Sequence, residues 1–343
     1  MNIFKLKNSP ILDKIKLIAL DLDGTTLTRN GLTRRTKETL EEAIANGVDV
    51  VIATGRPYSA LPEEVKNIKG LEYIIISNGA HIVKPLTGEF LYSNYVDRDA
   101  ILNVRRILME RDFPVEVFTE GRAYVDRELY EDVKKNGSTY LAAKYILRTR
   151  EPVDRIFDFW YEHSSRIENV NIQFEYQQDK AEMKTVLEKA EGITLTSSTF
   201  HNLEVGGETT SKASALEEVC RMKGITMENV MAFGDSPNDG AMIRGAGIGV
   251  AMENATADIL EDADITAPSN DDEGVAYTIR MLLLGETDPL LSSEFCEYTW
   301  PGRHGGIRPR NFYLCRRCKQ QFRRQWKSPF LRFLYLIVLS FLH

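Results

Sequence analysis

The sequence predicts an α/β protein, built on a doubly wound parallel sheet into which an α+β domain is inserted. Three observations point to this fold. Short apolar runs alternate with helical segments in both the early and the late part of the chain. Polar residues follow directly after several of these runs, and a long stretch of chain separates the two parts. Alternating strands and helices favour a parallel sheet that is covered by helices.

The early part of the chain is expected to supply three strands of this sheet. Each is a short apolar run rich in β-branched side chains, as is typical of buried strands. The three runs are residues 15–20, 48–53 and 73–76. A helix is expected over residues 34–46, because Thr33 can cap its start and Gly47 can end it.

The late part of the chain repeats the alternation and is expected to complete the sheet. The expected helices are residues 213–223, 237–244, 255–261 and 274–284. The expected strands are residues 230–233, 248–252 and a short one near 264–266.

The chain between Thr54 and Lys212 is too long to be a loop of a compact domain. We therefore expect an inserted domain at residues 85–199, which leaves residues 1–84 and 200–285 for the core. Its expected elements are a helix over 97–111, strands over 115–119, 122–125 and 170–176, and a helix over 179–190. Such an insertion would close over a site on the core and exclude water.

Two carboxylates stand at the end of the first expected strand. Asp21 and Asp23 are one residue apart, and Gly24 behind them permits a sharp turn. Ligand sites of open α/β sheets lie at the carboxyl ends of the strands. The pair points to a site that binds a divalent metal and attacks a phosphate, although an acidic turn after a strand, read alone, is more often a solvated loop.

Further polar groups stand at comparable places along the chain. They are Thr54-Gly55-Arg56, Ser77-Asn78-Gly79, Lys212 at a helix start, and Gly234-Asp235-Ser236-Pro237-Asn238-Asp239. Each has an ordinary structural explanation as a turn or as the first turn of a helix. A lysine near a helix N-terminus is electrostatically disfavoured, which favours a ligand for Lys212. Their joint occurrence favours one shared site.

Taken in order, four of these segments resemble the motifs of the haloacid-dehalogenase-like phosphohydrolases, in particular the Cof-type, subfamily IIB branch of sugar-phosphatase-like proteins. The four are Asp21-Leu-Asp23-Gly24-Thr25, Thr54-Gly55-Arg56, Lys212, and Gly234-Asp235-x-x-Asn238-Asp239. The resemblance covers about residues 15–284 and implies a Rossmann-like core with a type IIB cap inserted after the second motif. One departure is Ala213, where the branch often has glycine after the lysine.

The resemblance implies a role for each matched residue. Asp21 is expected to be the nucleophile that forms an aspartyl-phosphate, and Asp23 the general acid and then the general base. Mg²⁺ is expected as the cofactor, held by Asp21, the backbone carbonyl of Asp23, Asp235, and Asp239 directly or through water. The residues expected to bind the phosphoryl oxygens are Thr54, Gly55, Lys212 and Asn238.

The expected activity is that of a magnesium-dependent phosphatase acting on a small phosphorylated metabolite, such as a sugar phosphate or a flavin-type phosphate. Specificity is expected in the cap and at its joint with the core, with His201, Asn202, Glu204, Asn78 and Ser59 as candidates. Two alternatives stay open. One is a phosphomutase of the same superfamily. The other is a phosphometabolite-binding protein that its basic C-terminal stretch would target, although a pure binder has no need of an acid such as Asp23.

Composition fits a protein of two domains. The chain has 343 residues, of which 43% are hydrophobic and 27% charged. The apolar stretch that precedes Asp21 is too short for a signal peptide, so a cytoplasmic location is expected. No nucleic-acid partner is expected for the core, and the sequence does not indicate an oligomeric state.

The last stretch of the chain differs in composition. Residues 289–343 hold ten Lys and Arg against two Asp and Glu, in a chain whose net charge is −7. We expect residues 286–343 to be an appended tail, poorly ordered and irrelevant to catalysis, with contact to anionic surfaces as the alternative. A zinc site at Cys315 and Cys318 is disfavoured because a second ligand pair is missing.

Overall fold

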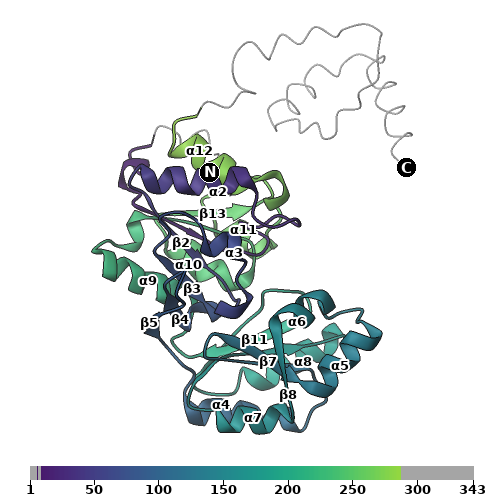
Figure 1. Ribbon diagram of the computed structural model, residues 1–343. Coiled ribbons are helices and arrows are strands. Elements are labelled where there is room, and N and C mark those ends of the chain that lie inside the picture. The colour runs from purple at the N-terminus through teal and green to yellow at the C-terminus, as the bar shows by residue number, and fades with distance from the viewer. Residues whose placement is uncertain (1–5, 7–8, 287–343) are drawn as a thin grey trace, which may run out of the picture. The chain divides into compact units, whose positions relative to one another are not determined.

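The computed structural model describes Leu6 and residues 9–286, which form two separate sheets (Figure 1). The larger one, here called the core sheet, has eight strands. In spatial order they are β14 (Ile265–Ala267), β13 (Ile248–Met252), β12 (Val230–Gly234), β1 (Leu17–Leu20), β2 (Asp49–Ala53), β3 (Tyr73–Ile76), β4 (His81–Val83) and β5 (Phe90–Ser93). The predicted fold class is confirmed.

The core sheet is mainly parallel, as predicted. Strands β14 through β3 pair in parallel, whereas β4 and β5 extend one edge with antiparallel pairing. The antiparallel edge was not predicted, because β4 has only three residues and β5 is largely exposed. Neither strand carries the long apolar run by which buried strands are recognised.

Helices cover both faces of the core sheet. On one face lie α2 (Arg34–Ala45) and α12 (Gly274–Leu282), which contact each other (Figure 1). On the other lies α9 (Lys212–Lys223). Within β1, Ile18 and Leu20 belong to the apolar cluster that α2 and α12 cover. Leu17 and Ala19, which alternate with them, belong to the cluster that α9 covers. The sheet is therefore doubly wound.

Local signals at two helix starts account for where these helices begin. The hydroxyl of Thr33 accepts the N–H of Thr36 at 3.1 Å, which confirms the predicted N-cap of α2. The hydroxyl of Ser211 accepts the N–H of Ser214 at 3.0 Å and so caps α9. Lys212 is thereby placed in the first turn of α9, next to the core sheet.

The smaller sheet, here called the second sheet, has six strands. They are β10 (Ile193–Thr196), β11 (Asn202–Gly207), β9 (Ile167–Gln173), β6 (Val115–Thr119), β7 (Arg122–Asp126) and β8 (Arg150–Val153). All neighbours are antiparallel except β7 and β8. The helices packed into its main apolar cluster are α4 (Arg98–Met109), α7 (Ile156–Glu162) and α8 (Gln177–Leu187).

Further short helices complete the connections. In the core they are α3 (Glu63–Lys66), α10 (Gly240–Gly245) and α11 (Ala257–Asp262). Near the second sheet, α5 (Arg127–Asn136) and α6 (Ala143–Thr149) pack against each other. The predicted helix over residues 237–244 forms as a 3₁₀ turn, η5 (Pro237–Asp239), followed by α10.

Strand pairing shows where the chain changes sheet. It leaves the core sheet after β5 and enters the second sheet at β6, and it leaves the second sheet after β11 and returns at β12. The limits of 85–199 for an inserted domain stay a prediction. Among the described residues, no helix has the length and apolar character that crossing a bilayer requires. The predictions for residues 287–343 lie outside the described residues, and the cytoplasmic location stays a prediction.

Candidate active site

A buried lysine joins two carboxylates at the carboxyl ends of β1 and β12. The Nζ atom of Lys212 donates to Asp21 Oδ1 at 2.6 Å and to Asp239 Oδ1 at 2.7 Å. All three side chains are buried. Burial by itself lowers the pKa of Lys212, but the two carboxylates outweigh it and raise that pKa above its ordinary value. The lysine is therefore a fixed positive charge next to Asp21.

A third carboxylate completes an acidic cluster. Asp21, Asp235 and Asp239 each place an oxygen within 4.8 Å of the others. Asp235 accepts the hydroxyls of Thr25 at 2.8 Å and Ser236 at 3.0 Å. Burial, together with the charge of Asp239, raises the pKa of Asp235 to about 6. Carboxylate oxygens are the ligands that Mg²⁺ prefers, so this cluster fits a divalent cation.

The loop after β12 orients its own carboxylate. The Oδ2 atom of Asp239 accepts the N–H groups of Asp235 at 3.0 Å and Ser236 at 3.1 Å, which leaves Oδ1 for Lys212. This loop folds tightly against the end of the strand, since a Cβ on Gly234 would lie 2.4 Å from Cβ of Asp239. The glycine is therefore needed for this close approach.

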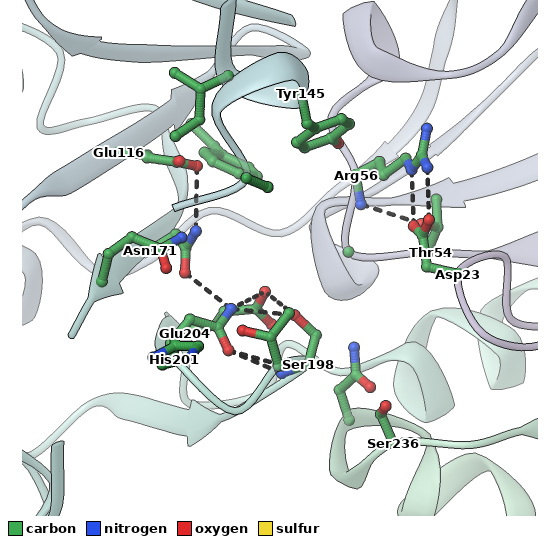
Figure 2. Close-up of a pocket in the computed structure, with 18 of the residues that line it drawn as sticks. Asp23, Thr54, Arg56, Glu116, Tyr145, Asn171, Ser198, His201, Glu204 and Ser236 are labelled. Carbon is green, nitrogen blue, oxygen red and sulfur yellow. Dashed lines mark hydrogen bonds and ion pairs between the residues drawn. The ribbon is translucent and has the colours of Figure 1, made fainter. Parts of the chain in front are cut away.

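Asp23 lies beside this cluster and is held by an arginine. Arg56 donates from Nε to Asp23 Oδ2 at 2.7 Å and from Nη2 to Asp23 Oδ1 at 2.5 Å. The Asp23 side chain is 56% exposed and so reaches solvent. Figure 2 shows the two side chains facing each other at the cavity. The predicted metal contact of Asp23 is through its backbone oxygen and stays a prediction.

Of the expected phosphate-binding residues, Thr54 and Gly55 follow β2, Asn238 follows β12, and Lys212 begins α9. Thr54 is buried, and its hydroxyl accepts the N–H of Arg56 at 3.1 Å. Gly55 packs close to Asn78, because a Cβ there would lie 3.1 Å from Asn78 Oδ1. Asn238 donates from Nδ2 to the same Oδ1 at 3.0 Å. Among the described residues, Oδ1 of Asn238 is buried and has no hydrogen-bond partner.

A cavity of about 370 Å³ opens onto these residues (Figure 2). Its lining from the core sheet's loops is Asp21, Asp23, Thr54, Gly55, Arg56, Ser236 and Asn238. Its lining from the strands of the second sheet is Glu116, Phe118, Arg150, Asn171, Gln173, Asn202 and Glu204. The structure thus brings most of the predicted site residues to one cavity, and Asp21 in its lining contacts Lys212 and belongs to the acidic cluster.

The second sheet presents a polar face to this cavity. In β6, Val115 and Val117 pack into the apolar cluster under the helices, while Glu116 and Phe118 line the cavity. Arg150 donates to Glu116 Oε2 from Nη2 at 2.6 Å and from Nε at 2.9 Å, and both side chains are buried. On this wall, Arg150 and Glu116 therefore offset each other's charge, while the carboxylate of Glu204 accepts from neutral donors.

Sequence reasoning missed several residues of this wall. Glu116, Arg150 and Asn171 form one hydrogen-bonded group. The guanidinium groups of Arg150 and Arg56 lie 4.7 Å and 5.1 Å from the centroid of the Tyr145 ring. The signal was present in part, because the polar Glu116 stands between the apolar Val115 and Val117. Tyr145 in α6 and Arg150 in β8 lie in segments that carried no comparable pattern.

The predicted specificity candidates are distributed over three positions. His201, Asn202 and Glu204 line the cavity, and Asn78 binds Glu204 from behind its wall. Ser59 instead lines a neighbouring hollow that shares Asp23 and Arg56 with the cavity. The Nδ1 atom of His201 lies 2.9 Å from the carbonyl oxygen of Phe174 and donates to it.

Comparison with known proteins gives consistent matches. Residues 18–279 match the family described as haloacid dehalogenase-like hydrolase. The phosphatase YwpJ of Bacillus subtilis is 31% identical over 289 residues, covering 78% of this chain and 100% of that protein. The 5-amino-6-(5-phospho-D-ribitylamino)uracil phosphatase YcsE of the same organism is 33% identical over 273 residues, covering 79% and 96%.

Solved structures agree with these sequence matches. A haloacid dehalogenase-like hydrolase from B. subtilis has a TM-score of 0.66 at 29% identity, covering 79% of this chain and 100% of that one. The sugar phosphatase BT4131, of subclass IIB, has a TM-score of 0.65 at 25% identity, covering 77% and 98%. The arrangement of a mainly parallel sheet with a second, mixed sheet matches that subclass.

Proposed function

This chain belongs to the haloacid dehalogenase-like hydrolase family and is a phosphatase, and we propose that it hydrolyses a small sugar phosphate or similar metabolite through an aspartyl-phosphate on Asp21. The observation that carries this proposal is the placement of Asp21. Its carboxylate is buried against Lys212 and Asp239, beside Asp235, at the base of an open cavity.

The charges around Asp21 reduce the electrostatic repulsion that would oppose its attack on a phosphate. A phosphate monoester is a dianion and repels an attacking carboxylate unless positive charge offsets both. Lys212 supplies one fixed positive charge at 2.6 Å. Mg²⁺, held by Asp21, Asp235 and Asp239, would supply the second by neutralising the phosphoryl oxygens. The buried cluster is thus arranged for phosphoryl transfer, in which positioning and charge dominate.

In this proposal Asp21 is the nucleophile, and Asp23 is the general acid and then the general base. Asp21 attacks phosphorus and forms an acyl phosphate while the bond to the leaving oxygen breaks, and Asp23 gives that oxygen a proton. Water then attacks the aspartyl-phosphate, Asp23 takes a proton from the water, and phosphate and free Asp21 result. The bidentate contact with Arg56 keeps Asp23 at the cavity, and one Asp23 oxygen has to leave Arg56 to carry the proton that Asp23 donates.

The substrate class follows from the cavity and from the relatives. A volume of about 370 Å³ admits a small leaving group. On the wall opposite the phosphate site, the cation Arg150 is already paired with Glu116, and Asn171, Asn202 and Glu204 add hydrogen-bonding groups, which favours an uncharged, hydrogen-bonding leaving group. Two of the similar proteins are named for sugar and ribityl phosphates, which supports this class. Their names are those of phosphatases, which favours water over a second hydroxyl as the phosphoryl acceptor.

The experiment that tests this proposal is a panel of phosphorylated metabolites assayed for phosphate release with Mg²⁺ and with EDTA. Asp21→Asn is expected to abolish release, because a neutral amide cannot form the acyl phosphate. Asp13→Asn, the same change at an exposed aspartate, is the matched control and should behave as wild type. Turnover that survives Asp21→Asn, or that is equal in EDTA, would contradict the mechanism. Conversion to an isomeric phosphate without free phosphate would indicate a mutase.

A further inference from the structure

A chain of side-chain hydrogen bonds connects the loop after β12 with the second sheet. Asn238, in η5, donates from Nδ2 to Oδ1 of Asn78 at 3.0 Å. Asn78 lies in η3 (Ser77–Gly79), after β3, and donates from Nδ2 to Oε2 of Glu204 at 2.7 Å. Glu204 belongs to β11. Three segments that are distant in sequence therefore meet through a single asparagine.

The direction of these hydrogen bonds is set by Glu204. Its Oε1 accepts from Ser198 Oγ at 2.8 Å and from Asn202 Nδ2 at 3.1 Å, and its Oε2 accepts from Asn78. The carboxylate therefore receives donors on both oxygens. Because Nδ2 of Asn78 is committed to Glu204, its Oδ1 must face Asn238 and take one of that amide's two N–H groups. The second N–H of Asn238 is left for an acceptor in the cavity.

The backbone of Asn78 shows how firmly this arrangement is held. Asn78 has φ 56° and ψ 27°, and Ser77 also has a positive φ of 49°. Left-handed backbone is unfavourable for most residues, but asparagine tolerates it better than others. The Asn78 side chain is buried, and both ends of its amide are engaged. The fold thus places a polar residue in an uncommon backbone conformation at this junction.

The chain of hydrogen bonds continues along the cavity wall. Nδ2 of Asn202 also donates to Oδ1 of Asn171 at 3.0 Å, and Nδ2 of Asn171 donates to Glu116 Oε2 at 3.1 Å. These residues line the part of the cavity opposite the phosphate site. A change at that wall can therefore reach Asn238 through groups that do not touch the phosphoryl group.

We propose that Asn78 and Glu204 are positioning residues that orient the amide of Asn238 toward the phosphoryl group. They act through Asn238 and join the cavity wall of the second sheet to the phosphate site. The proposal rests on the proposed function, because it takes the phosphoryl group to lie beside Asn238.

Exchange of donor and acceptor within the pair tests the proposal. Asn78→Asp places a carboxylate against Glu204 in place of a donor, and Glu204→Ala removes the acceptor without adding charge. Each is expected to weaken the binding of vanadate, in the presence of Mg²⁺, by about tenfold or more and to lower kcat/KM in parallel. The double variant Asn78→Asp with Glu204→Gln reverses the donor and the acceptor, so that the glutamine amide donates to the new carboxylate, which still accepts from Asn238. It should recover most of the wild-type affinity.

Vanadate affinity is measured by calorimetry, so it does not depend on turnover, and thermal unfolding of each variant reports on folding. Glu89→Gln, a carboxylate-to-amide change in an exposed ion pair with Lys84, is the matched control. Wild-type affinity in both Asn78→Asp and Glu204→Ala, or no recovery in a folded double variant, would overturn the proposal. A wild-type protein that binds vanadate and hydrolyses nothing on the panel would contradict the proposed function alone.

Discussion

At the scale of single residues, the site is a group of buried charges around Lys212. One buried ammonium group contacts two carboxylates, while Asp235 completes a cluster with more negative than positive charge. Buried charges that lack a partner are costly, so this excess favours a bound cation. Burial, and after it the charge of Asp239, raise the pKa of Asp235 to about 6.

The raised pKa of Asp235 predicts how pH and Mg²⁺ act on stability. In metal-free protein, the unfolded chain loses this proton near its ordinary pKa of 3.8, and the folded protein only near 6. Stability therefore falls as pH rises through this window, because the folded state binds more protons there. Mg²⁺ binds the ionised cluster, so it should raise Tm more at about pH 7.5 than at about pH 5.

Differential scanning calorimetry at both pH values, with Mg²⁺ and with EDTA, checks this expectation. Asp235→Asn should abolish most of the difference, because the amide neither ionises nor replaces the carboxylate as a ligand. An equal gain in Tm from Mg²⁺ at both pH values would count against a metal site at this cluster.

At the scale of secondary structure elements, the site depends on how η3 meets the start of α9. Gly79 has φ 103°, and a Cβ there would lie 2.1 Å from the carbonyl oxygen of Ser211. Ser211 caps α9, and Lys212 is the first residue of that helix. The close approach of these backbones therefore sets where the ammonium group of Lys212 lies.

Gly79→Ala is predicted to displace the first turn of α9 and with it Lys212. We expect a loss of about 2–4 kcal/mol in the free energy of unfolding, together with a large fall in kcat. Gly47→Ala is the matched control, since Gly47 also has a positive φ of 85° but no atom within 4 Å of a built Cβ. It should cost only about 1–2 kcal/mol and leave kcat unchanged. Urea denaturation and steady-state assays measure both, and equal effects would refute the argument.

At the scale of the whole molecule, buried polar contacts join the core sheet to the second sheet. The carboxylate of Glu168, in β9, accepts Ser77 Oγ at 2.7 Å and the N–H of Gly121 at 2.6 Å, and His81 Nε2 lies 3.1 Å away. Glu168 and His81 are fully buried. Together with the contact of Asn78 and Glu204, these interactions hold the polar wall of the second sheet over the phosphate site.

The family match and every predicted site residue lie before residue 287. Deletion of residues 289–343 is therefore predicted to leave kcat and KM unchanged on the best substrate of the panel. Parallel steady-state assays of the full chain and the shortened chain measure this. A large loss of turnover in a folded, shortened protein would show that the basic tail takes part in catalysis.

The sequence by itself determined the elements of the core and the identity of the catalytic candidates. Strands such as β3 and β13 were predicted at their observed bounds, because a buried parallel strand is an apolar run that ends where polar residues begin. Asp21, Asp23 and Asp235 were found because they directly follow such runs. Local pattern is sufficient where one strand and its turn specify a position.

Only the tertiary structure decided which residues form the far wall of the site. Glu116 and Arg150 are 34 residues apart and come from strands that are not neighbours in sequence, and Asn78 meets Glu204 across 126 residues. Such pairings depend on strand order and on the docking of one sheet against another, which local periodicity does not encode. The bidentate contact of Arg56 with Asp23 likewise depends on β1 and β2 lying side by side.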